Sequence, residues 1–489
     1  MGTNNLFAGI NLALRAVLAH QQAIEVIEHN VANVNTRGYR RQEAILVAGL
    51  PYAPPGVVRD TYPGQMGQGV RVDTIRRFHL DFFDRRYRGE IAAQKRGEAS
   101  RDILRQVEAT LVENSPDGIS NKLDAFWEGW QTLTTDPTNM ALRSDLRERG
   151  DGLTEAFARR AQSLRDLRTD QDLAIRQRVI DINEMADHVG RLNAEIARVK
   201  STGDEPNDLL DERDRVLDTL AEVTGATSYI EPNGEMVVSI NGHALVVGTK
   251  AFQLTTQVVN NPPPTPAGTP GQDLAQIVWA DGFAFSAPSG ELAGLLDARD
   301  RVIPNQQIAL DLTALEVANQ VNALHQTGFG LPPLNATGFN FFDISGSAAG
   351  GVALSIRLDS TIDSAAGLNY IAAGSAADVP GDSTNALRIA NLSTGLFFNG
   401  GTTTINGYYT TSVGQAALEL ETVENETADR TLVAKSLDQQ RESVGGVSLD
   451  EEAAKLVQTQ RAYEAAARMM TTVDQMLDRL INGMGLVGR

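Results

Sequence analysis

Apolar residues near the end of the chain follow the seven-residue rhythm of a coiled-coil helix. Ser448 is followed three positions later by Glu451, a spacing typical of a helix capping box. No proline interrupts the next stretch, and Gly483 and Gly485 can end it. This pattern predicts one helix of roughly eight to ten turns, whose narrow apolar stripe needs a partner. The stripe comprises Leu456, Tyr463, Ala466, Met470, Val473, Leu477, Leu480 and Met484.

Apolar residues at the start of the chain follow the same seven-residue spacing. They are followed by the run NVANVNTRGY from Asn30 to Tyr39, whose asparagines and Gly38 favour the end of a helix. Two complementary stripes predict antiparallel end helices that form a coiled coil. Two independent amphipathic helices on one globular core are the alternative. The N-terminal stripe comprises Leu6, Ile10, Ala13, Val17, His20, Ile24, Ile27, Val31 and Val34.

The pattern between 83 and 200 is helical, with breaks near 114–118 and 136–137. Residues 141–200 contain no proline, which predicts one long helix of coiled-coil or bundle type. Further helices are predicted after Pro206, at about 289–325, and at 416–442. The stripe of the long helix comprises Leu153, Phe157, Leu164, Leu167, Ile175, Ile182, Val189, Leu192, Ile196 and Val199.

Two stretches interrupt the helical body. Residues 226–296 alternate between apolar and polar in short runs separated by turn signals such as Asn241-Gly242, which predicts hairpins. Residues 335–411 are rich in small residues and poor in charge. They predict a small β or mixed domain that points outward and carries none of the helical core.

The expected fold class is therefore mainly α with β insertions, an α+β arrangement of nested domains. Residues 1–40 and 443–489 would form the terminal coiled-coil domain. Residues 41–334 and 412–442 would form a long helical bundle with a β-rich lobe at about 226–288. Residues 335–411 would be the small β-rich domain inserted on the outside.

The amino-acid composition and net charge exclude several classes of protein. The 489 residues are 42% apolar, which allows proper cores, and they carry a net charge of −19, which argues against a general nucleic-acid binder. The chain has no cysteine, so disulfides, thiolate metal sites and cysteine nucleophiles are excluded. No run approaches the ~18 apolar residues of a membrane span, and the amphipathic N-terminus does not resemble a signal peptide. We expect neither nucleic acid nor membrane as a partner.

No catalytic arrangement is evident in the sequence. The six histidines are scattered without paired ligand spacing, so we expect no metal, no cofactor and no enzymatic activity. Acids at 208–214 alternate with Arg213 and Arg215, which favours a salt-bridged helix start over acid–base chemistry. Arginines and aromatic residues crowd together between 71 and 88. The acids among them indicate a salt-bridged helix face rather than a nucleic-acid patch.

Several runs resemble the bacterial flagellar axial proteins of rod and hook. The run from Asn30 to Tyr39 is similar to their N-terminal signature, although Arg37 stands where proline often precedes Gly-Tyr. The runs SLDEE at 448, QRAY at 460 and TTVDQML at 471 resemble their C-terminal signature. The runs PNDLLDERD at 206 and SGELAG at 289, with the long helices, resemble more narrowly the first hook-associated protein family. The motif residues are Asn30, Asn33, Asn35, Thr36, Gly38, Tyr39, Asp208, Leu209, Leu210, Asp211, Arg213 and Asp214.

The resemblance implies a secreted structural adaptor between hook and filament that polymerises through its terminal helices. Implied partners are copies of itself in a ring-like zone, the hook protein, a second junction protein (hook-associated protein 3) and a flagellar export chaperone. Another axial protein (hook, rod or flagellin-like) is the nearest alternative; an axial enzyme or an extracellular coiled-coil adhesin is more distant. The implied assembly interface comprises Leu6, Ile10, Val17, Ile24, Ile27, Val31, Leu456, Tyr463, Met470, Val473, Leu477 and Leu480.

Overall fold

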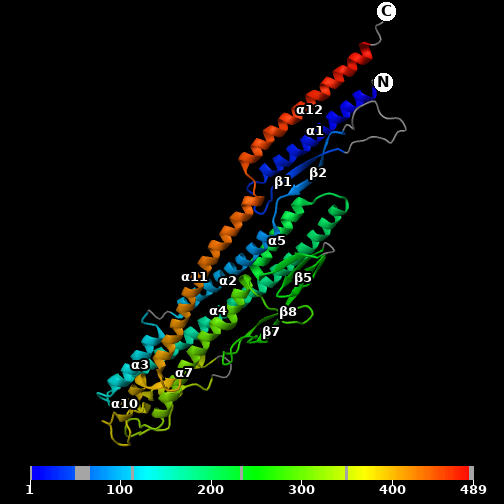
Figure 1. Cartoon of the computed structure of the whole chain (residues 1–489). Coiled ribbons are helices and arrows are strands. Elements are labelled where there is room, and N and C mark those ends of the chain that lie inside the picture. The colour runs from blue at the N-terminus through cyan, green and yellow to red at the C-terminus, as the bar shows by residue number, and fades with distance from the viewer. Residues whose placement is uncertain (1–2, 50–66, 112–114, 232–234, 347–350, 484–489) are drawn as a thin grey trace, which may run out of the picture.

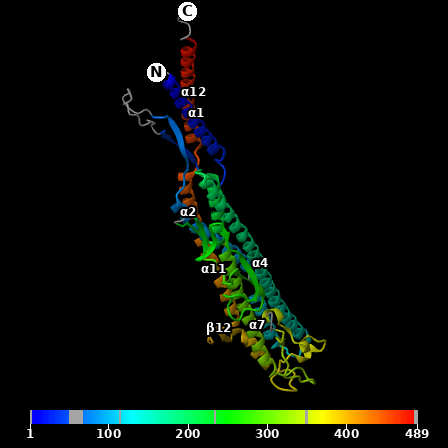
Figure 2. The same ribbon diagram turned by 90° about the vertical axis from the view of Figure 1, so that its right-hand side faces the viewer.

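The structure is a computed structural model that describes residues 3–49, 67–111, 115–231, 235–346 and 351–483. The molecule is elongated (Figures 1 and 2). The first and last helices lie side by side at one end, and the short elements of 335–404 lie at the other. Long helices of the body run between the two ends, so the chain leaves one end, turns at the far end and returns.

The two terminal helices pack antiparallel. Helix α1 (Thr3–Ala32) and helix α12 (Leu449–Gly483) are in contact along their length. Gly9 faces Val473 near one end, and Asn30 bonds to Glu452 near the other, so the directions are opposed. Because Gly9 has no side chain, the backbone of α1 comes close enough for a Cβ there to lie 3.6 Å from the Val473 methyl carbons.

A β-ribbon covers a second side of α1. Strands β1 (Gln42–Ala48) and β2 (Val70–Arg77) pair antiparallel, with a bulge between Ile45 and Leu46. The ribbon contacts α1, and Arg15 Nη1 donates to Gln68 Oε1 at 2.8 Å. We call α1, β1, β2 and α12 the terminal unit.

The buried stripe of α1 differs in phase from the prediction. Its buried residues are Ala13, Ala19, Ala23, Val26, Ile27 and Asn30, whereas Val31 is 38% exposed. The helix is covered from two directions, by α12 and by the ribbon, so its buried face lies between the two neighbours. On α12 the positions predicted from Leu456 to Leu477 are buried or half-buried, and small Ala466 is the most enclosed.

The body consists of helices. They are α2 (Asp81–Leu111), α3 (Ile119–Leu133), α4 (Met140–Ser201), α5 (Asn207–Thr224), α6 (Gly290–Asp297), α7 (Ile303–His325) and α11 (Ile405–Gly445). The long helix predicted over 141–200 is confirmed: Asn139 caps it by accepting from the Ala141 N–H at 2.9 Å. Its predicted stripe is buried from Leu153 to Ile196. A π-helical turn (Ala298–Val302) joins α6 to α7, and Pro304 follows it.

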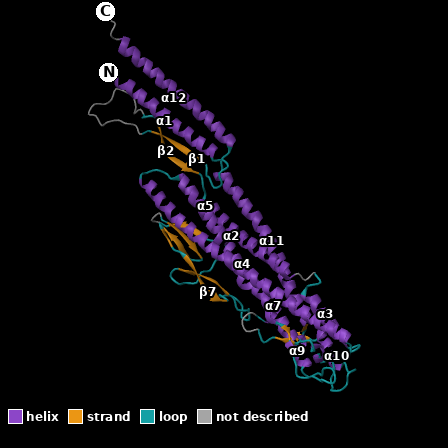
Figure 3. Ribbon diagram, turned by 180° about the vertical axis from the view of Figure 1, so that it is seen from behind, coloured by secondary structure: helices purple, strands orange, loops and turns teal. Residues whose placement is uncertain are grey.

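The predicted hairpins form two small sheets beside α4, drawn in orange in Figure 3. The first sheet is antiparallel and contains β3 (Thr227–Ile230), β4 (Met236–Ile240), β5 (His243–Val247) and β6 (Lys250–Ala251). The second pairs β7 (Leu254–Asn260) with β8 (Asp273–Trp279). Asn241 and Gly242 connect β4 to β5 at φ of 48° and 85°, the left-handed values that a tight hairpin turn requires.

The stretch after α7 contains only short elements among its described residues. They are β9 (Phe342–Asp343), α8 (Val352–Ser355), β10 (Arg357–Leu358), α9 (Ser360–Asp363), α10 (Thr384–Ala390), β11 (Leu396–Phe398) and β12 (Thr403–Thr404), together with two short 3-10 helices (Gly367–Tyr370 and Asn391–Thr394). Helix α11 begins at Ile405, earlier than the predicted 416, because the Thr404 hydroxyl accepts from the Gly407 N–H at 3.0 Å and caps it.

This stretch shares the core of the body. Phe341 and Phe342 are fully buried against Phe126 of α3, and Phe341 also packs against Trp130, with ring centroids 5.4 Å apart. These residues belong to the same buried cluster as the α4 stripe. The expectation that the insertion carries none of the helical core is therefore wrong.

Candidate functional site

The signature run after α1 forms a buried junction around Asn30. The Asn30 carboxamide bonds to the backbone of Gln42 in both directions: Nδ2 donates to its C=O at 2.8 Å, and Oδ1 accepts its N–H at 2.9 Å. The same Nδ2 donates to Glu452 Oε2 at 2.9 Å, and the Tyr39 hydroxyl donates to Oδ1 at 2.8 Å. Both Asn30 and Glu452 are almost completely buried, at 0% and 1% exposure. One side chain thus joins α1, β1 and α12.

The other signature residues shape the turn. Asn33 Nδ2 donates to the His29 carbonyl at 3.0 Å, and Thr36 Oγ1 donates to Asn33 Oδ1 at 3.2 Å. Asn35 is exposed. Gly38 has a φ of 86°, which L side chains rarely adopt, so the turn requires glycine there whatever precedes it. Burial, followed by the charges of nearby carboxylates, raises the pKa of the Tyr39 phenol and keeps it a hydrogen-bond donor.

Of the two hydrogen bonds in the capping box predicted at the start of α12, the structure contains only the one to Ser448. The Glu451 N–H donates to the Ser448 hydroxyl at 3.5 Å. The Glu451 carboxylate, however, does not turn back to the helix start, because it accepts from Arg41 Nη1 at 2.9 Å. The helix end is therefore tied to the segment that leaves α1.

Helix α5 presents a row of acids toward the terminal unit and the helices beside it. We call this row the α5 acidic stripe: Asp208, Asp211, Asp214, Asp218 and Glu222. Steps of three and four residues place these carboxylates on one face of the helix. Asp208 Oδ1 accepts from Gln42 Nε2 at 2.8 Å, and Glu222 lies 3.4 Å from Arg37.

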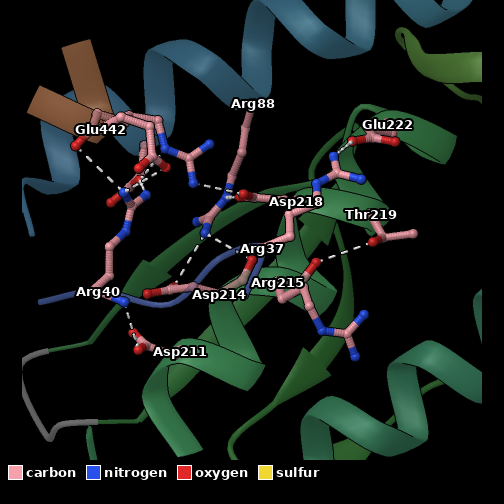
Figure 4. Close-up of polar contacts among 12 residues, drawn as sticks. Arg37, Arg40, Arg88, Asp211, Asp214, Arg215, Asp218, Thr219, Glu222 and Glu442 are labelled. Carbon is pink, nitrogen blue, oxygen red and sulfur yellow. Dashed lines mark hydrogen bonds and ion pairs between the residues drawn. The ribbon is translucent and has the colours of Figure 1, made fainter. Parts of the chain in front are cut away.

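Arginines from other segments meet the middle of the stripe (Figure 4). Arg77 at the end of β2 reaches Asp211 at 2.9 Å and Asp214 at 2.6 Å. Arg88 of α2 lies 3.2 Å from Asp214 and 2.6 Å from Asp218. The Arg40 backbone N–H donates to Asp211 Oδ2 at 2.9 Å.

The network continues to Asp84 of α2. Arg441 of α11 lies 2.7 Å from Asp218 and 2.9 Å from Asp84. The Arg40 guanidinium lies 3.2 Å from the same Asp84 carboxylate. The network thus connects five segments, and all five meet where the terminal unit joins the body.

Burial and charge act in opposite directions on these acids. Burial raises the pKa of Asp211 to about 7, although Arg77 and the Arg40 N–H favour its ionised form. Burial also disfavours the charge of Asp214. There, however, Arg77 and Arg88 outweigh burial and hold the pKa below its ordinary value. Asp214 therefore provides a charge that depends on its arginine partners.

Most of these acids do not form the ion pairs within α5 that the sequence predicts. Only Glu212 and Arg215 form the expected pair within α5, at 2.5 Å among the described contacts. Asp211 and Asp214 instead pair with arginines far away in the chain. Arg213 is buried and donates to Asn193 Oδ1 at 3.2 Å. Leu209 and Leu210 pack against the main apolar core.

Arg40, Asp218 and Arg441 were not predicted from the sequence. The spacing of the acids along α5 was a usable signal, because it predicts one acidic face. The sequence around each arginine gives no signal that it would contact that acidic face.

The residues predicted as an assembly interface lie along the terminal pair. Ile27 is buried, while Ile10, Val17 and Ile24 are half-buried; Tyr463, Met470, Val473 and Leu477 are also half-buried. The side chains of Leu6 and Leu480 lie outside the described residues. Other apolar side chains of the pair are exposed, namely Leu14, Leu18, Leu449, Val457, Met469 and Met476.

The described part of the chain contains neither a metal-binding cluster nor a membrane-spanning helix. No group of three or more His, Asp or Glu residues within those ranges could hold a metal ion. None of the helices described is both long enough and apolar enough to cross a membrane.

Comparisons with known proteins identify the family. A family model described as the flagellar hook-associated protein FlgK helical domain matches residues 104–342. A second, described as the flagellar basal body rod FlgEFG protein C-terminal, matches residues 439–483. Flagellar hook-associated protein 1 of Bacillus subtilis is 30% identical and is aligned over 99% of both chains. The chain belongs to the flagellar hook-associated protein 1 family.

Other relatives agree with this membership. Flagellar hook-associated protein 1 of Salmonella typhimurium is 26% identical, over 97% of this chain and 99% of the relative. The solved flagellar hook junction protein FlgK from Burkholderia pseudomallei has a similar fold, with a TM-score of 0.62 at 16% identity. That match covers 74% of this chain and the whole of the solved chain. The mainly helical architecture with small separate sheets is thus shared with a family member.

Proposed function

We propose that this protein is a structural adaptor that joins the flagellar hook to the filament, without enzymatic activity. Membership of the hook-associated protein 1 family supports this role. The observation that carries it is the pairing of α1 with α12: these first and last helices pack together at one end of a long body. The match at 104–342 favours a hook-associated protein over a rod or hook protein, because it lies in the helical body rather than in the shared C-terminal region.

The terminal unit is the proposed assembly surface. Its helices would form a coiled coil within the inner part of the structure, and copies would associate in a ring-like zone. Leu14, Leu18, Met469 and Met476 support this, because they remain exposed after α1 and α12 have packed. Burying one such side chain against a neighbouring copy contributes roughly 1.5–3 kcal/mol, and a ring repeats that gain in every subunit.

The remaining partners follow from the same role. The hook protein would lie on one side of the zone, and hook-associated protein 3 on the other. An export chaperone would keep the chain ready for passage through the flagellar secretion channel. The nested domains remain part of this proposal, with residues 335–411 on the outside, although this stretch shares the buried core of the body.

Substitution of two exposed methionines tests the assembly surface. Met469→Asp with Met476→Asp should leave the monomer folded and secreted, yet abolish filament attachment in a strain that lacks the native protein. Val379→Asp with Leu387→Asp is the matched control, since both residues are exposed at the opposite end of the molecule. Swimming cells with normal filaments from the methionine variant would contradict the proposal. Comparing secreted protein in the medium separates an export defect from an assembly defect.

A further inference from the structure

The contact between the terminal unit and the body is polar. The two clusters of buried apolar residues in the described chain lie in the body, and no residue of α1, β1, β2 or α12 belongs to either. Four guanidinium groups and four carboxylates meet at the contact instead. They are Arg40, Arg77, Arg88, Arg441, Asp84, Asp211, Asp214 and Asp218.

These ion pairs are directional. The Arg77 guanidinium bridges Asp211 and Asp214, one turn apart on α5, and its side chain is 6% exposed. A planar guanidinium that meets two carboxylates holds one relative orientation of the segments that carry them. Desolvation of so many charges offsets much of their attraction, so such a cluster contributes orientation more than adhesion.

The terminal unit has internal bonds that do not depend on this cluster. Asn30 joins α1 to β1 and α12, and Arg15 joins α1 to the end of the ribbon near β2. Two chain segments connect the unit to the body, at 78–80 and 446–448. Gly446 lies in the second of them. Reorientation of the unit would therefore require changes in only a few backbone torsions.

We propose that this Arg–Asp cluster is a latch that fixes the angle between the terminal unit and the body. With the ion pairs intact the unit has one orientation. When the α5 carboxylates lose their charge, the unit pivots on its connecting segments while both parts stay folded. Arg77, Asp211 and Asp214 are the positioning residues of this latch.

Distance measurements on the full chain test the latch. The protein has no cysteine, so spin labels will attach only at cysteines introduced by substitution. Labels at Gln458→Cys on α12 and Glu184→Cys on α4, both exposed positions, span the contact. The parent should give one narrow distance distribution. Asp211→Asn with Asp214→Asn should make it roughly twofold broader or shift its maximum.

Controls separate pivoting from unfolding. Glu212→Gln removes an acid from the same helix whose partner is Arg215 of α5 itself, and it should change nothing. Label pairs within the body (Glu184→Cys with Asp429→Cys) and within the terminal unit (Gln22→Cys with Gln458→Cys) should keep their distances in the double variant.

Two results would overturn the latch. One is an unchanged distribution across the contact in the double variant. The other is broadening of the internal pairs together with the spanning pair, which would make the cluster part of the fold itself. If the double variant does not fold, Arg77→Lys retains the charge but loses the two-pronged contact. A spanning distance unchanged by Arg77→Lys then refutes the proposal.

Discussion

The side chains of Asn30 and Glu452 are hydrogen bonded at 2.9 Å, although 422 positions separate them in the sequence. This bond lies at the base of the terminal pair, where α1 ends and α12 begins. Because the Asn30 carboxamide also pairs with the Gln42 backbone, it sets the position of three segments at once. A buried polar group whose partners all lie at fixed positions disfavours any other register of the two helices.

Asn30→Ala should destabilise the terminal unit. The change removes the Asn30 partner of the Gln42 N–H and C=O and of Glu452 Oε2, and each unsatisfied buried group costs about 1–3 kcal/mol. Hydrogen exchange should show faster exchange at the Gln42 amide and in the first turns of α12. Asn35→Ala, at an exposed position of the same turn, is the control. Parent-like protection at Gln42 in Asn30→Ala would show that the carboxamide does not hold β1.

Phe341→Ala should destabilise the far end of the body. The ring is fully buried among Phe126, Trp130 and His325, and removing such a ring costs roughly 3–5 kcal/mol. Thermal unfolding followed by tryptophan fluorescence should shift to lower temperature. Phe339→Ala is the control, because that ring is 38% exposed and should matter much less. Equal melting temperatures of the two variants would indicate that the insertion is independent of the core of the body.

Stability should fall in acid through His325. Its Nδ1–H donates to the Phe339 carbonyl at 2.7 Å, and its Nε2 accepts the Ala372 N–H at 3.0 Å, so the folded state holds the neutral ring. Burial lowers the pKa of His325 from 6.5 to about 4. The unfolded state therefore binds the proton first, and stability present above pH 6.5 is lost as the pH falls toward 4. The loss is at most about 3 kcal/mol.

Urea unfolding at several pH values would measure this loss. Asp311 acts in the opposite sense: burial raises its pKa to about 6, so its contribution is lost as the pH rises through 6. The His325 effect is therefore isolated by comparing the parent with His325→Gln across the same range. The variant should be less stable at pH 7 but lose less on acidification. If the free energies of unfolding of the parent and the variant changed in parallel with pH, the protonation of His325 would not be coupled to folding.

Amide exchange should be fastest toward the tips of the terminal helices. Their contact relies on small or half-buried side chains, such as Gly9 opposite Val473, which bury little apolar surface to offset the entropy of ordering. Amides from Ile10 to Val17 and from Met470 to Leu477 should exchange faster in dilute monomer than those from Leu153 to Val179. Strong protection of both tips in a verified monomer would contradict this.

The sequence determined the elements whose causes are local. The long helix α4 follows from a sustained apolar period, an asparagine cap and the lack of proline between its ends. The β4–β5 hairpin follows from Asn241-Gly242, because these residues adopt left-handed torsions at little cost. The end of α1 near Asn33 likewise follows from asparagines that compete with helical hydrogen bonds.

Tertiary structure decided the features that depend on which distant surfaces meet. The acids of α5 were visible in the sequence. Their partners are the Arg40 backbone N–H and the guanidinium groups of Arg77, Arg88 and Arg441, which come from four separate segments that only the folded chain brings together. The phase of the α1 stripe likewise depends on a ribbon that covers a second side of the helix. The apolar period of a helix predicts that one of its faces is buried. Which element covers that face depends on the path of the whole chain.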